Sequence, residues 1–219
     1  MTLVCLALLV AVTSCGSPSR SPETPVNSAP AAAPASSGKT LSPAALLDKV
    51  KFKREDGSEA LSVKPRDNGA KVVDGAENEL VRLTIDGNKI KLKDAEDEVL
   101  GYVVVDSSKL KLTNADRSTD LFVVRLQEDG DYKLESGTDE FIYRIKQRDY
   151  GYEIESPDDR SLYKVKIKDG KLSLRDASDR TILSTRDELS PVAMTAFGFE
   201  VMSPEQQAAI AYALHLAGN

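Results

Sequence analysis

Apolar and charged positions alternate along short segments through most of the chain. In residues 89–93, KIKLK, lysines hold the odd positions and apolar residues hold the even ones, and residues 109–112 and 171–174 repeat the alternation. A period of two puts successive side chains on opposite faces of a β-strand. The pattern therefore predicts strands with one face in water and the other face buried.

The alternating segments recur about every 20 residues. Each block opens at a turn signal, runs into an alternating strand, meets a second acidic turn and ends in another alternating strand. The blocks begin at Leu46, Arg66, Asp86, Asp106, Glu128, Arg148 and Lys168, and the block at Asp106 is slightly longer than the others. This order of signals predicts seven consecutive β-hairpins.

Two kinds of turn separate the predicted strands. The tight reversals carry residues that accept positive φ, namely Asn68-Gly69, Asp86-Gly87, Asp129-Gly130 and Asp169-Gly170. The turns inside the blocks are acidic, at residues 94–97, 114–117 and 176–179. A calcium loop is the alternative interpretation of these acidic turns, but the ligand spacing and central Gly of such a loop are missing. We expect local hydrogen bonding at the turns and no metal site.

A dozen or more strands in series, with no helix between them, would leave exposed edges in one open sheet. Closure removes the edges. The sequence therefore predicts a mainly β fold: a closed antiparallel barrel of about 12–14 short strands built from 20-residue hairpin repeats. A β-propeller is the competing architecture, although blades need about 40 residues each.

The pattern changes after Thr185. Ser190-Pro191 and Ser203-Pro204 both read as helix starts, with a capping Ser before a Pro at the first helical position. Gln206 completes a capping box with the second Ser. The segment at 191–199 is short and apolar, so it is either a short helix or an extended strand.

The second helix is expected to run to Gly218 and is apolar around nearly its whole circumference. Such a helix must be buried on all sides, and it is shorter than the roughly 20 residues that cross a bilayer. We expect this hydrophobic C-terminal helix in the interior of the barrel. His215 is its one plainly polar side chain between 208 and 217, which favours a core histidine with one hydrogen-bond partner, or one near the exposed end, over a ligand or base.

The amino-terminal segment has the features of a targeting signal. Residues 2–14 carry no charge and are too few to span a membrane, but are long enough for a signal-peptide core. The segment ends at Val12-Thr13-Ser14-Cys15 and resembles the bacterial lipoprotein signal, which implies lipidation of Cys15 and cleavage before it. The Lys or Arg that usually precedes the apolar core is missing. The alternative is an ordinary secretory signal that is cut elsewhere.

The expected organisation has three parts. Residues 1–14 form the lipoprotein signal peptide, residues 15–41 hold the lipidated Cys and a Pro/Ser/Ala-rich linker, and residues 42–219 form the β-barrel domain with the C-terminal helix. A proline-rich recognition ligand is the alternative for the linker. Gly16 follows the Cys where Asp would signal inner-membrane retention, so the lipoprotein resemblance implies a lipid-anchored protein of the bacterial outer membrane, facing the periplasm.

Composition and motifs disfavour several classes of function. The 29 Lys and Arg against 35 Asp and Glu give a net charge of -6, which disfavours a nucleic-acid binder. One His and two Cys leave little material for metal sites. No nucleophile elbow, phosphate loop, HExxH, CxxC or dinucleotide turn occurs in the domain. We therefore expect no catalytic residues, no metal site, no cofactor and no enzyme activity.

The strand repeat and the C-terminal helix together resemble the superfamily of tubby-like, LURP-one and phospholipid-scramblase proteins. The resemblance is architectural, and no signature residue matches by position. It implies a membrane-proximal, non-enzymatic module, since tubby-like members bind phosphoinositides through basic surfaces. This chain departs in being acidic. Its lysine-rich strand faces are either a local basic patch or a solvated face, at Lys89, Lys91, Lys93, Lys109 and Lys111.

The sequence thus predicts a membrane-anchored bacterial envelope lipoprotein whose β domain is a non-catalytic interaction or structural module. Its partners would be the membrane, through the N-terminal lipid, and other envelope proteins or lipids, but no nucleic acid. The alternatives are a carrier or sensor of an apolar or lipid ligand, which needs a cavity beside Tyr212, and a hydrolase assembled by the fold.

Overall fold

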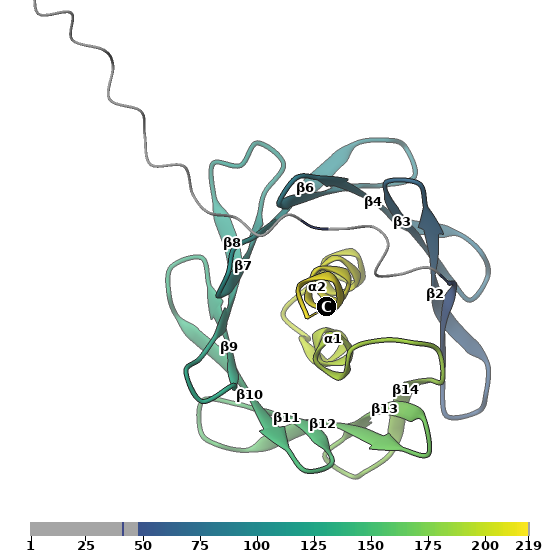
Figure 1. Cartoon of the computed structure of the whole chain (residues 1–219), viewed down its shortest axis with the longest axis vertical. Coiled ribbons are helices and arrows are strands. Elements are labelled where there is room, and N and C mark those ends of the chain that lie inside the picture. The colour runs from purple at the N-terminus through teal and green to yellow at the C-terminus, as the bar shows by residue number, and fades with distance from the viewer. Residues whose placement is uncertain (1–40, 42–47, 219) are drawn as a thin grey trace, which may run out of the picture. The chain divides into compact units, whose positions relative to one another are not determined.

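The computed structural model describes residue 41 and residues 48–218. In that part of the chain, fourteen strands run antiparallel to one another and close into a barrel (Figure 1). The strands are β1 (Val50–Lys53), β2 (Glu59–Arg66), β3 (Gly69–Asp74), β4 (Glu79–Asp86), β5 (Lys89–Lys93), β6 (Val99–Val105), β7 (Lys109–Thr113), β8 (Asp120–Leu126), β9 (Tyr132–Ser136), β10 (Phe141–Arg148), β11 (Gly151–Glu155), β12 (Ser161–Lys168), β13 (Lys171–Asp176) and β14 (Thr181–Thr185).

Each strand pairs with its neighbours in sequence, and β14 returns to pair with β1. The prediction of a mainly β, closed antiparallel barrel with a C-terminal helix is therefore confirmed. The predicted signal peptide, Cys15 and the predicted linker up to residue 40 lie outside the described residues. Among the described helices, none has the length and apolar character needed to cross a membrane.

The two ends of the barrel use different turns. We call the end where β1 begins and β14 finishes the entry end, and the opposite end the far end. Reversals at the entry end include two-residue turns such as Asp169-Gly170, where both residues have positive φ, 50° and 70°. Each described far-end turn places one residue at positive φ, in register with the 20-residue repeat, at Gly57, Glu77, Asp97, Arg117, Asp139, Asp159 and Asp179.

The far-end turns explain how the repeat bends each hairpin. A residue in the left-handed region at the end of a four-residue turn produces a bulge in the adjoining strand. The register accordingly shifts beside these turns, for example between Leu92 and Lys93 and between Leu174 and Arg175. The periodicity that predicts the strands therefore also sets the curvature of the barrel.

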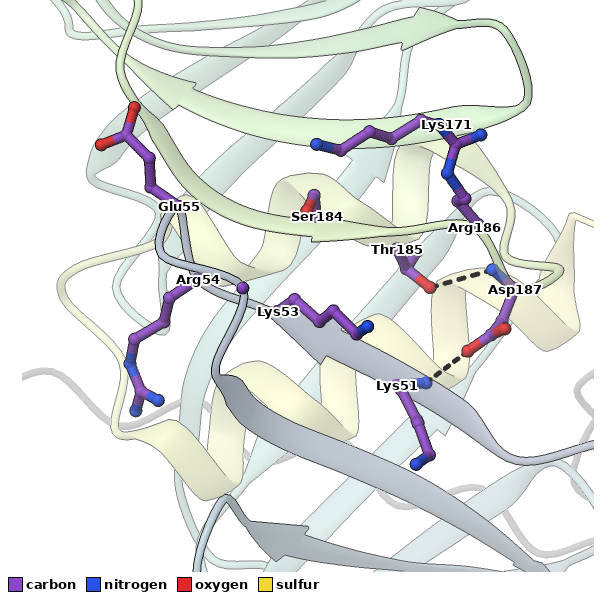
Figure 2. A pocket seen from close by; sticks show the side chains of 10 residues that line it. Lys51, Lys53, Arg54, Glu55, Lys171, Ser184, Thr185, Arg186 and Asp187 are labelled. Atoms are coloured by element: carbon purple, nitrogen blue, oxygen red, sulfur yellow. Dashed lines mark hydrogen bonds between the residues drawn. The ribbon is translucent and has the colours of Figure 1, made fainter.

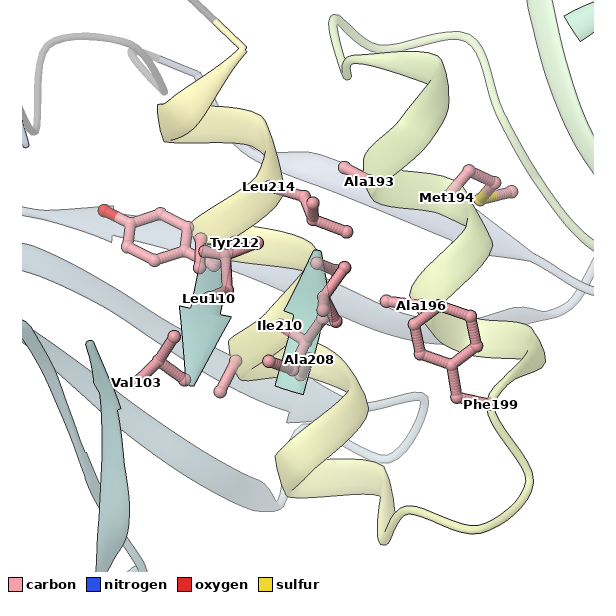
Figure 3. Packing of buried hydrophobic residues seen from close by; sticks show 14 of the residues in the cluster. Val103, Leu110, Ala193, Met194, Ala196, Phe199, Ala208, Ile210, Tyr212 and Leu214 are labelled. Carbon is pink, nitrogen blue, oxygen red and sulfur yellow. The ribbon is translucent and has the colours of Figure 1, made fainter. Parts of the chain in front are cut away.

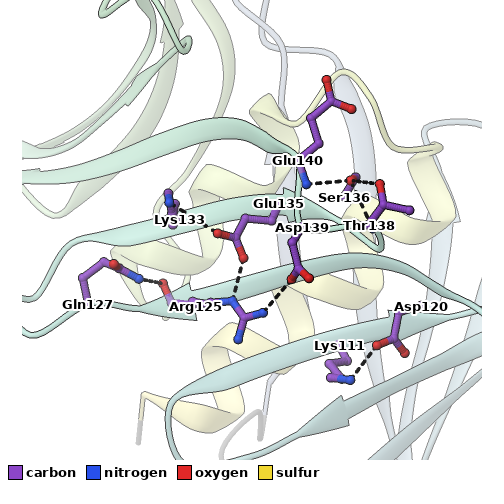
Figure 4. A network of polar contacts seen from close by, with 10 residues as sticks. All are labelled: Lys111, Asp120, Arg125, Gln127, Lys133, Glu135, Ser136, Thr138, Asp139 and Glu140. Carbon is purple, nitrogen blue, oxygen red and sulfur yellow. Dashed lines mark hydrogen bonds and ion pairs between the residues drawn. The ribbon is translucent and has the colours of Figure 1, made fainter.

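Charged side chains cover the outer face of the strands and pair across them. Arg125 donates from Nε to Oε2 of Glu135 at 2.6 Å and from Nη2 to Oδ1 of Asp139 at 3.0 Å (Figure 4). Lys133 approaches the other oxygen of Glu135 at 3.4 Å. The charged half of the alternating pattern is thus a network of cross-strand ion pairs.

The apolar half of the pattern points inward onto helices that fill the barrel. These are α1 (Pro191–Thr195), the 3₁₀ turn η2 (Ala196–Gly198) and α2 (Pro204–Ala217). Figure 1 shows both α-helices inside the ring of strands, and Figure 3 shows their apolar side chains packed against it. Ile210 and Phe199 are fully buried, and Gly198 packs so closely on β11 that an added Cβ would lie 2.7 Å from Ile154 Cδ1. The C-terminal helix is therefore interior, as expected.

Only one of the two predicted Ser-Pro caps forms. Ser203 accepts from the N–H of Gln206 and receives the reciprocal bond of a capping box. Ser190 makes no side-chain cap, so that prediction is wrong. The N–H that its hydroxyl would satisfy, on Ala193, already donates to the backbone oxygen of Ser190 at 3.0 Å. The segment at 191–198 is helical rather than extended.

Candidate functional site

The barrel closes through an unusually short contact. Strands β1 and β14 are in register at a single pair, Lys53 and Ser184, because β14 ends at Thr185 and the chain then turns into the interior. Beyond that pair, the N–H of Lys51 donates to Oδ2 of Asp187 at 2.6 Å (Figure 2). A carboxylate therefore takes the place of a partner strand, and we call this junction the seam.

A groove of about 340 Å³ lies over the seam. Side chains enter it from β1 and its turn on one side and from β13, β14 and the residues that follow on the other (Figure 2). Its lining residues are Lys51, Lys53, Arg54, Glu55, Gly57, Lys171, Ser184, Thr185, Arg186 and Asp187. The position of Gly57 is open, since no atom lies within 4 Å of where a Cβ would be. We call this feature the seam groove.

The seam groove is positively charged in an acidic protein. Five basic residues and two acidic ones line it, a surplus of three positive charges, whereas the whole chain carries -6. Lys51 pairs with Glu59 at 3.3 Å. Burial raises the pKa of Glu59, but hydrogen bonding to Lys51 and the charge of Lys49 outweigh it and lower that pKa below its ordinary value. The carboxylate is thus ionised and neutralises Lys51.

The other cations in the groove are not neutralised in this way. Arg54 donates to the backbone oxygen of Glu59 at 2.9 Å, and Arg186 donates to the backbone oxygen of Asp169 at 2.9 Å. Within residues 48–218, no carboxylate lies within ion-pair distance of Lys53 or Lys171. The groove therefore holds uncompensated positive charge, which attracts anions.

The lumen offers far less space than the seam groove. The apolar hollow beside Tyr212 has a volume of about 10 Å³, and a second hollow, between α2 and the turn after β6, has about 70 Å³. One water molecule needs at least about 10–15 Å³, and a ligand pocket about 300 Å³. The Tyr212 hydroxyl is buried with no partner among the described residues, and burial raises its pKa to about 12. Neither of these two hollows beside α2 is large enough for the apolar ligand that a carrier would hold.

His215 is a core histidine. It is 3% exposed, and its Nδ1 accepts from the backbone N–H of Ser190 at 3.1 Å. The predicted alternative of a buried His with a hydrogen-bond partner is therefore confirmed. The donor in this bond is the backbone N–H of Ser190 and not its hydroxyl.

The other residues highlighted by the sequence lie on the outer face. Lys93 pairs with Asp97 at 2.9 Å and Lys111 with Asp120 at 2.5 Å, and β6 separates the lysine row of β5 from that of β7. Lys89, Lys91 and Lys109 make no ion pair among the described residues, so the lysines of these two strands are only partly neutralised. Cys15, the predicted lipidation site, lies outside the described residues.

The carboxylates of the acidic turns accept hydrogen bonds from their own loops. Oδ1 of Asp176 accepts from the N–H groups of Ser178 and Arg180, and Asp94 accepts from the N–H of Glu98 at 2.8 Å. In the described part of the chain, no three His, Cys, Asp or Glu residues gather to hold a metal ion. These contacts match the prediction that the acidic residues form local hydrogen bonds within their turns.

Sequence reasoning missed the seam groove. The run KFKRE at 51–55 is rich in cations, but it reads as an ordinary outer strand face. The residues opposite it, Lys171 and Arg186, come from the last repeat and the segment beyond it. Pairing the first block with the last would have brought them together, since closure of the barrel requires that contact.

The fold and site define a closed antiparallel barrel around C-terminal helices, with a basic groove where the barrel closes. No family model matches the chain, and no curated protein matches it. Among solved structures, the X-ray structure of a protein from Arabidopsis thaliana is similar at 11% sequence identity, over 73% of this chain and 93% of that chain, with a TM-score of 0.38. A likeness at this level carries no argument about family or function.

Proposed function

We propose that the protein is a lipid-tethered, non-catalytic binding module of the bacterial envelope, and that the seam groove is its binding surface. The observation that supports it is the contrast between the filled lumen and the groove of about 340 Å³ on the outer face. A barrel that carries a charged concavity on its outer face suits recognition of a charged partner. The hydrogen bond from the backbone N–H of Ser190 to Nδ1 of His215 uses no hydroxyl, which also disfavours the hydrolase alternative.

The chain reaches the barrel at the entry end. The N–H of Leu41 donates to the backbone oxygen of Gly87, in the turn between β4 and β5, at 3.2 Å, and β1 begins at this same end. A lipid on Cys15 would tether the barrel to the membrane through the Pro-rich linker. We place the anchor in the outer membrane with the barrel in the periplasm, where other envelope proteins or lipids are the partners.

The resemblance to tubby-like, LURP-one and scramblase proteins belongs to the same proposal. Its support is a closed barrel with the C-terminal helix inside. The basic character that the acidic composition hides is present locally, in the seam groove.

Metabolic labelling with a palmitate analogue tests the tether. Wild-type protein expressed in a bacterium is expected to incorporate the label, Cys15→Ser to lose it, and Cys5→Ser, the matched control in the signal segment, to keep it. Equal labelling of wild type and Cys15→Ser would refute the anchor.

A fluorescent fatty acid tests the carrier alternative. Because the hollow beside Tyr212 holds only about 10 Å³, no saturable binding is expected. Saturable binding at one site per protein would favour the carrier over the binding module.

A further inference from the structure

We propose that the seam groove binds a compact phosphoryl-bearing anion with two or more negative charges. This inference rests on the proposed binding function but does not depend on the lipid tether. Its basis is the set of cations that the barrel brings together from both ends of the domain sequence.

The groove gathers like charges without neutralising them. Lys53 enters from β1 and Lys171 from β13, and in the described chain neither has a carboxylate partner. Arg54 and Arg186 bond to neutral backbone oxygens and keep their full charge. Like charges held in one concavity repel each other, so a bound anion lowers the energy of all four groups.

The two acidic residues of the lining offset only two of its five positive charges. The carboxylate of Asp187 is held by the N–H of Lys51 at the seam. Figure 2 shows the carboxylate of Glu55 directed away from Lys53 and Lys171. The free positive charge therefore faces the open part of the groove.

The donors on the two sides of the seam favour phosphoryl oxygens over a planar carboxylate. Arg pairs bidentately with either group, and the ammonium of Lys is a point charge that binds phosphate. Arg54 and Arg186 each donate to a backbone oxygen through Nη1, which leaves their other guanidinium N–H groups available beside the two lysines. A phosphoryl group offers more oxygens to such a set of donors than the two of a carboxylate. The volume, about 340 Å³, falls within the range of about 300–1,000 Å³ for small-molecule pockets.

A ligand in this groove would join the two sides of the seam. The backbone register between β1 and β14 is a single pair, so contacts from Lys53 and Lys171 to one anion would add a second connection. Binding should therefore slow amide hydrogen exchange in β1, where the seam is weakest.

Calorimetric titration of the full-length protein with pyrophosphate tests the site. We expect one saturable site in wild type and a loss of affinity of about tenfold or more in Lys53→Gln/Lys171→Gln. The matched control is Lys89→Gln/Lys91→Gln, which removes the same charge from the outer face of β5 and should change the affinity by less than about twofold. Lys53→Arg/Lys171→Arg keeps the charge and should retain most of the binding.

Two results would overturn the proposal: no saturable pyrophosphate binding, or equal weakening in the groove and control variants. Circular dichroism establishes that each variant is folded. If Lys53→Gln/Lys171→Gln does not fold, amide exchange of wild-type protein with and without pyrophosphate decides, since unchanged exchange throughout β1 contradicts binding at the seam.

Vesicle sedimentation identifies the source of the phosphoryl group. With Cys15→Ser, binding to phosphatidic acid vesicles but not to phosphatidylcholine vesicles, lost in the Lys53→Gln/Lys171→Gln background, indicates a lipid headgroup. Pyrophosphate binding without sedimentation indicates a soluble ligand. Failure of the groove leaves the labelling of Cys15 unaffected, so the two proposals fail separately.

Discussion

At the scale of single residues, most far-end turns contain one residue that both adopts the left-handed turn conformation and contacts a neighbouring strand through its side chain. Five of the seven left-handed residues in the described far-end turns are acidic, and each carboxylate pairs with a basic residue of a neighbouring strand: Glu77 with Lys64, Asp97 with Arg82, Asp139 with Arg125, Asp159 with Arg144 and Asp179 with Lys166. In one repeat this residue is basic instead of acidic: the guanidinium of Arg117 lies over the ring of Tyr102, 5.1 Å from its centroid. The repeat therefore encodes a turn and a cross-strand contact together.

The left-handed conformation predicts how these positions tolerate substitution. Asp159 (φ 58°) makes a long ion pair with Arg144, at 3.5 Å, and both side chains are exposed, so the pair contributes little. Asp159→Gly should therefore change the free energy of unfolding by less than about 1 kcal/mol. Asp159→Val should lose about 1–2 kcal/mol, because a branched side chain is strained there. Urea denaturation measures both.

Gly57 is the matched position in the first repeat, with φ 85° and open space around it. Gly57→Asp should be tolerated and Gly57→Val should not. If Val is tolerated as well as Asp at both positions, the turn conformation is not what selects these residues.

At the scale of elements, the alternating pattern was sufficient to predict the hairpins, since each strand pairs with a neighbour in sequence. The interior position of α2 also followed from residues alone, because a helix with Ile210 and Leu214 on one face and Tyr212 and Leu216 on the opposite face has no polar side to turn to water. The cap at Ser190 could not be predicted. A Ser-Pro pair signals a helix start, but which acceptor takes the N–H of Ala193 depends on how the chain enters the barrel.

The two Ser-Pro starts give a matched pair of variants. Ser203→Ala removes a capping box and should cost about 0.5–2 kcal/mol of unfolding free energy. Ser190→Ala removes a buried hydroxyl that has no partner among the described residues, so it should be neutral or stabilising. Urea denaturation of both variants tests this, and an equal loss would contradict the assignment of the caps.

At the scale of the whole molecule, function depends on where the barrel closes. Closure itself is predictable, because a long series of hairpins must bury its edges. The charge at the seam is not, since Lys53 and Lys171 stand at opposite ends of the series and meet only when the ring is complete. On the lysine faces of β5 and β7, by contrast, Lys93 pairs with Asp97 and Lys111 with Asp120, and in the described part of the chain no groove gathers the remaining lysines with cations from the other end of the series.

The ion-pair network of the outer face should make the fold sensitive to acid. A hydrogen bond from Lys71 lowers the pKa of Glu79 below its ordinary 4.5. Burial raises the pKa of Glu135, but hydrogen bonds from Arg125 and Lys133 outweigh burial, so the pKa lies below its ordinary value (Figure 4). Carboxylates with a lowered folded pKa contribute stability that is complete above about pH 4.5 and is lost as the pH falls through their folded pKa values.

Urea denaturation between pH 7 and pH 3 should therefore show a falling free energy of unfolding. Glu135→Gln should flatten part of that fall, while Glu96→Gln, in an exposed turn, should not. A fall that is the same in all three proteins would show that the network does not cause it.

The most direct test of the seam as the functional site is to follow backbone amide resonances during titration with pyrophosphate. The expected result is a saturable shift confined to Lys51, Lys53, Ser184 and their neighbours, with β7 and β8 on the opposite wall unchanged. Shifts spread evenly around the barrel, or none at the seam, would contradict it.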